Sequence, residues 1–221
     1  MSSFFSRLIG RKPMGELPPV LSPEGIKRLF SDIPTLTTRR LVLRRIVDGD
    51  YLDMYEYACL DSVTRYLLWY PHPDPEYTRR YISRLNQEYA SGKFSDWGIS
   101  VDDGGRNKLI GTCGFTEIDC GNRKAEIGYV LNPRYWGMGI AAEAAARVIS
   151  FGFETLGVNR IEARYMAGND RSRRVMEKLG MRYEGMLRQS MFVKGEYRDI
   201  GECSILLPEY RAMTGRNTQA R

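Results

Sequence analysis

Residues 126–141 read Glu-Ile-Gly-Tyr-Val-Leu-Asn-Pro-Arg-Tyr-Trp-Gly-Met-Gly-Ile-Ala, and no other part of the chain is as informative. A β-prone apolar run ends at Asn132-Pro133, a loop with glycines at 137 and 139 follows, and an alanine-rich segment then predicts a helix. At such a strand–loop–helix junction, several backbone N–H groups and the positive end of the helix dipole converge. The stretch therefore predicts an anion site, most naturally one for phosphate or pyrophosphate.

Two known phosphate-binding motifs can be compared with this loop. The Gly-x4-Gly-Lys-[Ser/Thr] pattern of a Walker loop does not occur, which excludes that motif. Gly137-x-Gly139-x-x-Ala142 does match the spacing of a dinucleotide-binding loop, and Glu162 follows where a ribose-binding acid would lie. A dinucleotide-binding fold should continue with further strand–helix crossovers, whereas one short helix and a β-hairpin are predicted after Glu162. A protein that binds a nicotinamide dinucleotide therefore stays an alternative with little support.

Arg134-Tyr-Trp-Gly137-Met-Gly139 also fits the pattern [Arg/Gln]-x-x-Gly-x-[Gly/Ala], and it resembles the acetyl-CoA loop of the GNAT N-acetyltransferases. Residues 126–131, 136–144 and 169–185 carry the resemblance, which spans roughly 34–210 and is greatest to the branch with the RimJ and RimL ribosomal-protein acetyltransferases. It implies an α+β fold of the GNAT (acyl-CoA N-acyltransferase) type, with a mixed, mostly antiparallel central sheet flanked by helices.

Apolar periodicity and turn residues predict the order of the elements. Glycines 157 and 180 are placed to end helices, and Lys194-Gly195 is placed to turn a hairpin. The predicted domain is 34–210, with an N-terminal extension (1–33) that contains one short amphipathic stretch and a basic C-terminal tail (211–221). Strands are expected over 40–46, 95–101, 108–118, 125–131, 160–166, 182–193 and 198–207, and helices over 48–60, 76–90, 140–156 and 171–179.

Charge and composition argue against several classes of function. The 221 residues carry a formal net charge of +6, but 1–33 hold five Lys/Arg against three Asp/Glu, and 211–221 hold three Arg and no acid. The remaining domain is almost neutral, so we expect no nucleic-acid partner. No apolar run is long enough to cross a membrane and no secretory segment is recognisable, so we expect no membrane partner and a cytoplasmic location.

Cysteine and histidine usage indicates neither a metal site nor a disulfide framework. The four cysteines form no Cys-x-x-Cys pair, and His72 is the single histidine. We therefore expect reduced thiols, no zinc site and no Ser-His-Asp triad. Either a monomer or a homodimer is compatible with the sequence.

The resemblance implies which residues contact acetyl-CoA. The N–H groups from Tyr135 to Ala141 would surround the pyrophosphate. Glycine is expected at 137 and 139 because a Cβ there would hinder the approach of phosphate to the backbone. The pantetheine arm would lie like an added strand beside 129–131, and Asn169 would hydrogen-bond its amide. The full predicted set is Tyr129, Val130, Leu131, Arg134, Tyr135, Trp136, Gly137, Met138, Gly139, Ile140, Ala141, Asn169 and Ser172.

Acetyl transfer to an amine needs a base and a donor to the developing oxyanion. Glu126 is the candidate base, and by strand alternation it shares a face with Gly128 and Val130. The alternative is a surface glutamate paired with Arg123 or Lys124. The backbone N–H of Val130 is the oxyanion donor that the resemblance implies.

The thiolate leaving group must also be protonated. Many GNAT enzymes have a tyrosine seven residues after the asparagine, but that position is Met176 here. In the RimL-like branch, a serine three residues after the asparagine is proposed as the acid, and Ser172 matches it. Alternatively, Asn169 or Asp170 caps the helix, Ser172 belongs to its first turn and water supplies the proton.

The predicted function is transfer of the acetyl group from acetyl-CoA to a primary amine, with a protein or peptide N-terminal α-amine as the first expectation. Met191 stands where RimL-type enzymes have a glutamate, which weakens the case for a ribosomal-protein acceptor. A small-molecule amine such as an antibiotic, a polyamine or an amino acid is the alternative acceptor. A non-catalytic sensor of acyl-CoA is the alternative outside enzymes.

Overall fold

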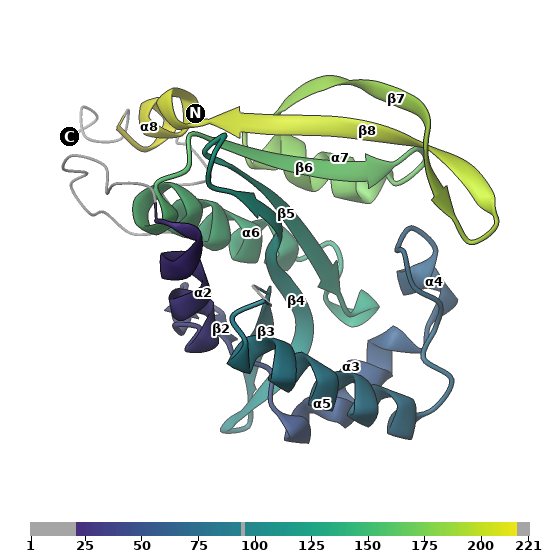
Figure 1. The fold of residues 1–221 in the computed structure, drawn as a ribbon. Helices are drawn as coiled ribbons and strands as arrows, with labels where there is room; N and C mark the ends of the chain where they lie inside the picture. Colours follow the sequence, from purple (N-terminus) through teal and green to yellow (C-terminus); the bar gives the residue numbers. More distant parts are fainter. Residues whose placement is uncertain (1–20, 94–95, 216–221) are drawn as a thin grey trace. The chain divides into compact units, whose positions relative to one another are not determined.

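The computed structural model describes residues 21–93 and 96–215 (Figure 1). They form two compact units, and strands β4 and β5 and helix α6 run from one unit into the other. The loop unit consists of Ser22–Gly114 and Tyr129–Ala144. Within the described residues, the hairpin unit consists of Phe115–Gly128 and residues 145–215, together with Leu21. Most of the predicted extension, residues 1–20, and the end of the predicted tail, residues 216–221, lie outside the described part.

The loop unit is built on antiparallel strands with helices α3 and α5 beside each other (Figure 1). Its core includes the fully buried side chains of Leu43, Ile82 and Ile99. Its elements are α2 (Pro23–Ser31), β1 (Leu36–Thr37), β2 (Val42–Arg44), a 3₁₀ turn (Asp48–Asp50), α3 (Tyr51–Ala58), α4 (Asp61–Thr64), α5 (Pro75–Ala90), β3 (Asp96–Asp103) and the first part of β4 (Arg106–Asp119).

The short amphipathic segment predicted before the domain does form a helix. Ser22 caps α2 by accepting a hydrogen bond from the Gly25 N–H, and Pro23 occupies the first turn, where its missing N–H costs nothing. The ring of Phe30 packs edge-on against Trp97, with 5.7 Å between ring centroids. Residues 22–31 are therefore attached to the core of the loop unit.

The hairpin unit contains one parallel pair of strands. β5 (Lys124–Leu131) and β6 (Arg160–Met166) run parallel from Lys124↔Arg160 to Ile127↔Ala163. Between them, α6 (Ile140–Phe151) continues as a π-helical turn (Gly152–Leu156) and ends at Gly157, whose φ of 71° is the left-handed conformation expected of a glycine after a helix. The unit is completed by α7 (Asp170–Lys178), β7 (Arg182–Val193), β8 (Glu196–Leu206) and α8 (Leu207–Gly215).

The dinucleotide-binding alternative is wrong, because the chain after β6 turns antiparallel. β8 pairs antiparallel with β6 from Arg160↔Leu206 to Met166↔Ile200, and β7 pairs antiparallel with β8. Glu162, the expected ribose-binding acid, is 8% exposed and lies within 3.6 Å of Lys124 Nζ and 2.7 Å of Arg160 Nε. Both contacts are ion pairs within the sheet, and they do not fit a carboxylate that binds a ribose.

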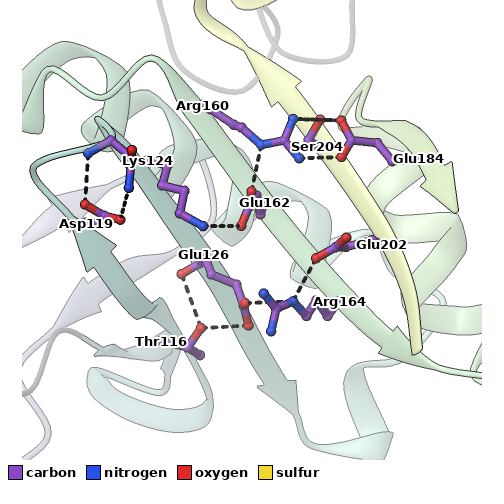
Figure 2. Close-up of polar contacts among 11 residues, drawn as sticks. Thr116, Asp119, Lys124, Glu126, Arg160, Glu162, Arg164, Glu184, Glu202 and Ser204 are labelled. Atoms are coloured by element: carbon purple, nitrogen blue, oxygen red, sulfur yellow. Dashed lines mark hydrogen bonds and ion pairs between the residues drawn. The ribbon is translucent and has the colours of Figure 1, made fainter. Parts of the chain in front are cut away.

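The two faces of the strands in the hairpin unit differ in character. Ile161, Ala163 and Ile205 are fully buried on one face, where the ring of Phe115 and the side chain of Ile161 lie against Gly152. The alternate residues of the same strands carry charges, which pair in a row both within β6 and across neighbouring strands (Figure 2). The candidate base Glu126 belongs to this polar row.

Candidate active site

The end of β5 lies very close to β4 within the loop unit. The Asn132 N–H donates to the Ile110 carbonyl at 2.8 Å, and a Cβ built on Gly111 would lie 2.3 Å from the Val130 carbonyl oxygen. This contact is below any ordinary van der Waals separation, so residue 111 must be glycine for the Val130 peptide to keep its place. The packing of β4 thereby fixes the carbonyl of Val130, the residue whose own N–H is the predicted oxyanion donor.

After β5 the loop turns through one turn of 3₁₀ helix, Pro133–Tyr135. The buried side chain of Asn132 accepts from the Arg134 N–H at 3.0 Å, and the N–H groups of Tyr135 and Trp136 donate to the carbonyls of Asn132 and Pro133 at 2.9 and 3.1 Å. Because the N–H groups of Tyr135 and Trp136 donate within this turn, they are not available to phosphate. The predicted pyrophosphate donors are therefore the N–H groups from Gly137 to Ala141.

Gly137 and Gly139 bring the chain from this turn into α6. Their φ values are 77° and 76°, in the left-handed region that favours glycine. Apart from its two chain neighbours, no residue in the described part of the chain has an atom within 4 Å of the Cβ position of Gly137, so that side of the loop is open. The N–H groups of the first turn of α6, which starts at Ile140, have no acceptors within the helix. Open space beside the first-turn N–H groups of a helix fits an anion such as the pyrophosphate of acetyl-CoA.

An ion pair between the buried Glu143 and the partly exposed Arg40 ties this loop to the segment before β2. Glu143, in the first turn of α6, is fully buried, and its carboxylate accepts from Arg40 Nε at 2.6 Å, from the Arg40 N–H at 3.1 Å and from the Thr38 hydroxyl at 2.7 Å. The same guanidinium donates through Nη1 to the Met138 carbonyl at 3.1 Å. Arg40 therefore neutralises a carboxylate beside the anion site and holds the loop backbone. The sequence pattern did not reveal this role, although a glutamate within an alanine-rich buried helix could have signalled a partner.

Arg134, a predicted cofactor residue, extends from the loop toward α3. Its Nη1 lies 2.7 Å from Glu56 Oε1, and its side chain is 76% exposed. Glu56 also binds Lys108 Nζ at 2.7 Å. The hydrogen bond from Lys108, with the charges of Lys108 and Arg134, lowers the pKa of the Glu56 carboxyl.

In the hairpin unit, Glu126 lies on β5 between a hydroxyl and a guanidinium (Figure 2). The Thr116 hydroxyl donates to Glu126 Oε1 at 3.0 Å, and Arg164 Nε lies 3.2 Å from Glu126 Oε2. Burial raises the pKa of the Glu126 carboxyl above its ordinary value, although Arg164 and Thr116 act in the opposite direction. A raised pKa makes this carboxylate a better proton acceptor near neutral pH.

The cations that the sequence offered as partners of Glu126 are directed elsewhere. Lys124 pairs with Glu162, and the Arg123 guanidinium donates to the Gly157 carbonyl at 3.1 Å. The cation beside Glu126 is instead Arg164, which sequence reasoning missed because its position depends on the register of β6 against β5.

The predicted pantetheine and acid residues lie at the start of α7. The Asn169 side chain caps this helix by accepting from the Ser172 N–H at 3.3 Å, which confirms the predicted helix cap. The cap uses Oδ1, and the Nδ2 group of an asparagine is a separate hydrogen-bond donor. Met176 is 1% exposed and belongs to the core. Capping thus accounts for Asn169 and for the backbone of Ser172, while their cofactor roles stay predictions.

The predicted residues therefore fall into two groups. Tyr129–Ala141 form one continuous strand end and loop in the loop unit, whereas Glu126, Asn169 and Ser172 belong to the hairpin unit. Within 21–93 and 96–215, no cluster of His, Cys, Asp and Glu is arranged to hold a metal ion. Nor does any helix in that part combine the length and apolarity needed to span a bilayer.

Comparison with known proteins identifies the family. The family model of the acetyltransferase (GNAT) domain matches residues 40–182. The chain is 36% identical over 176 residues to the uncharacterized N-acetyltransferase p20 of Bacillus licheniformis, covering 80% of this chain and 98% of that protein. It is also 27% identical over 190 residues to the [ribosomal protein uS5]-alanine N-acetyltransferase of Escherichia coli, covering 81% of this chain and 95% of the enzyme.

Solved structures agree with the sequence matches. A GNAT-family acetyltransferase from Bacillus anthracis superposes with a TM-score of 0.68 at 29% identity, covering 78% of this chain and 98% of that one. Spermidine N-acetyltransferase from Vibrio cholerae, solved with CoA and spermine, superposes with a TM-score of 0.63 at 22% identity, covering 77% and 98% of the two chains. The chain belongs to the GNAT family: it has the predicted GNAT fold and is an acetyl-CoA-dependent N-acetyltransferase.

Proposed function

We propose that the enzyme acetylates the N-terminal α-amine of a protein or peptide. The observation that carries the proposal is Glu126, a half-buried carboxylate of raised pKa on the polar row of β5. A single carboxylate is a modest base, and an α-amine of pKa about 8 loses its proton far more readily than a lysine of pKa about 10.4. The similarity to the uS5-alanine acetyltransferase supports the same acceptor class.

In this proposal the loop residues Gly137–Ala141 bind the pyrophosphate, the edge of Tyr129–Leu131 receives the pantetheine arm and Asn169 binds its amide. Glu126 accepts the proton of the attacking amine, directly or through one water molecule. The Val130 N–H stabilises the oxyanion, and Ser172 or water protonates the departing thiolate. Acetyl-CoA supplies the activated thioester.

Titration calorimetry tests the cofactor half of the proposal. We expect micromolar binding of acetyl-CoA and no binding of NAD or NADP. Gly137→Glu should abolish acetyl-CoA binding, because it places a carboxylate on the open side of the loop, where the phosphates are proposed to lie. Gly195→Glu, in the β7–β8 turn, also introduces a glutamate at a positive-φ glycine in open space and serves as the control. Retained binding by Gly137→Glu would remove the loop from the site.

An acceptor panel followed by thiol release tests the other half. We expect turnover with peptides that have a free N-terminus and none with the same peptides after N-terminal acetylation, even where they contain lysine. Turnover on spermidine or an aminoglycoside alone would replace the proposed acceptor with a small amine. Binding of acetyl-CoA with no turnover on any amine would support a sensor instead.

Gly111→Ala should reduce both stability and turnover. The added methyl would lie 2.3 Å from the Val130 carbonyl oxygen, so strands β4 and β5 must move apart. We expect a loss of about 1–3 kcal/mol in the free energy of unfolding, as for other overpacked sites, and a lower kcat because the oxyanion donor is displaced. Gly49→Ala, where no atom lies within 4 Å of the added Cβ, is the control. Full kcat in a destabilised Gly111→Ala protein would argue against the role of Val130.

A further inference from the structure

Arg164 lies between two carboxylates on neighbouring strands of the polar row (Figure 2). Its Nε atom is 3.2 Å from Glu126 Oε2 on β5 and 3.1 Å from Glu202 Oε1 on β8. The strand register imposes this position. Arg164 lies directly opposite Glu202 on β8, while Glu126 on β5 lies opposite Glu162, two residues before Arg164 on β6. One guanidinium nitrogen is thus shared by a carboxylate proposed to be catalytic and by a second carboxylate that the proposed chemistry does not use.

The other cations near Glu126 bind other carboxylates, and the remaining charged groups near it are themselves carboxylates. Lys124, on the same strand, faces Glu162, and Arg160 on β6 binds Glu162, Glu184 and Ser204. Glu117 on β4 and Glu162 on β6 both raise the pKa of Glu126 by repulsion, although burial is the largest cause. Arg164 is the largest influence in the opposite direction. The pKa of Glu126 therefore depends on how strongly the Arg164 guanidinium interacts with its carboxylate.

A second arginine–glutamate pair in the same row shows what a contact through both terminal nitrogens does, even though the Nε of the same arginine also binds Glu162. Glu184 receives both terminal nitrogens of Arg160 and the hydroxyl of Ser204, and these contacts lower its pKa to about 2. Glu126, which is more buried and lies beside the same Nε atom that contacts Glu202, has a raised pKa instead. A carboxylate with the pKa of Glu184 would be too weak a base for an amine.

We propose that Arg164 and Glu202 are positioning residues that together set the basicity of Glu126: Arg164 orients its carboxylate, and Glu202 competes for the guanidinium so that Glu126 stays able to accept the proton of the amine. The inference rests on the proposed role of Glu126 as the base. Glu202 acts through Arg164 and needs no contact with the substrate.

The proposal requires shifts of opposite sign from two substitutions. Arg164→Gln removes the attraction and should raise the pKa of Glu126, by about one unit or more for a charge at this distance. Glu202→Gln releases the guanidinium to Glu126 and should lower that pKa. In an Arg164→Gln background, Glu202→Gln should have much less effect, because the shared cation is gone. Arg164→Lys should fall between wild type and Arg164→Gln, since it keeps the charge but not the planar fork.

The pKa of Glu126 can be measured without any activity, by NMR titration of the side-chain carboxyl in protein labelled with ¹³C-glutamate. The resonance is assigned by its absence from Glu126→Gln. Arg160→Gln is the matched control, because it removes another arginine from the same face of β6, and it should leave the Glu126 titration nearly unchanged. Shifts of the same sign in Arg164→Gln and Glu202→Gln, or an undiminished effect of Glu202→Gln without Arg164, would overturn the inference.

The pH profile of kcat separates this inference from the proposed function. The acidic limb should move to higher pH in Arg164→Gln and to lower pH in Glu202→Gln, while the acceptor amine titrates identically in every variant. Limbs that follow the NMR values support both proposals. If the NMR values shift as expected but the limbs do not, the coupling is real and Glu126 is not the base. If the NMR values do not shift, the inference is wrong whatever the activity of Glu126→Gln.

Discussion

Glu126→Gln should lower kcat for amine acetylation by about 100-fold or more while the Kd for acetyl-CoA changes little, because loss of a general base typically costs 10²- to 10⁴-fold. Glutamine has nearly the size of glutamate, and its carbonyl oxygen can still accept the hydrogen bond that Thr116 donates at 3.0 Å. What disappears is the capacity to take a proton and the ion pair with Arg164. The substitution therefore tests the proton transfer more than the fold of β5.

The control for this variant is Glu117→Gln. Glu117 is an exposed glutamate on β4, next to Thr116, and its substitution removes one negative charge close to Glu126 without touching the proposed base. We expect a change in kcat of less than about threefold, since solvent and salt screen the interaction between this exposed charge and Glu126. The two variants should be compared at equal saturation with acetyl-CoA, with binding checked by calorimetry. Equal activity in Glu126→Gln and wild type would mean that solvent accepts the proton of the amine and that Glu126 is not the base.

The pH dependence of the wild-type rate follows from the same carboxyl. Its pKa is raised, so its protonated and inactive form persists to higher pH than it would for an exposed glutamate. Activity should consequently fall on the acidic side earlier than an ordinary glutamate would cause, and rise as pH increases through the pKa of Glu126 and then of the amine. In Glu126→Gln the residual rate should depend on the ionisation of the amine alone.

Local rules were enough to predict the loop and most elements. The bounds of β6 and β7 agree with the predicted strands, and Gly157 ends the helix where expected, because turn residues and alternation act over a few positions. The two-residue strand β1 was too short to have a pattern. No predicted element covered α8, which begins at Leu207 with Pro208 in its first turn.

The partners of the charged residues could not be predicted in the same way. Arg164 is 38 positions from Glu126 and Arg40 is 103 positions from Glu143, so each pair depends on which strands and helices become neighbours and in what register. The sequence supplied the residue types at the site, including Glu126 and both loop glycines. It did not supply the electrostatic environment, which determines whether a carboxylate acts as a base or only as one half of an ion pair.

Arg40→Gln should have the largest combined effect on stability and cofactor binding. It leaves the Glu143 carboxylate fully buried with only the Thr38 hydroxyl and the residue-40 N–H as donors. Arg40 is 38% exposed, so the loss should be smaller than for a fully buried ion pair, and we expect about 1–3 kcal/mol of the free energy of unfolding. We also expect acetyl-CoA binding to weaken at least tenfold, because an unneutralised carboxylate would then repel the phosphates and the Met138 carbonyl would lose its donor.

Two further variants separate these effects. Arg44→Gln breaks a second ion pair, in which the guanidinium of Arg44 binds Asp50 at 2.7 and 2.8 Å and also donates to the carbonyls of Arg45 and Asn107, which lie outside the loop. It should lose stability and keep the Kd for acetyl-CoA. Adding Glu143→Gln to Arg40→Gln removes the buried charge and should restore much of both losses. If Arg40→Gln weakens the fold yet binds acetyl-CoA as tightly as Arg44→Gln, the pair serves only the fold. A selective loss of binding that Glu143→Gln repairs would show that neutralising this carboxylate is what lets the first turn of α6 receive an anion.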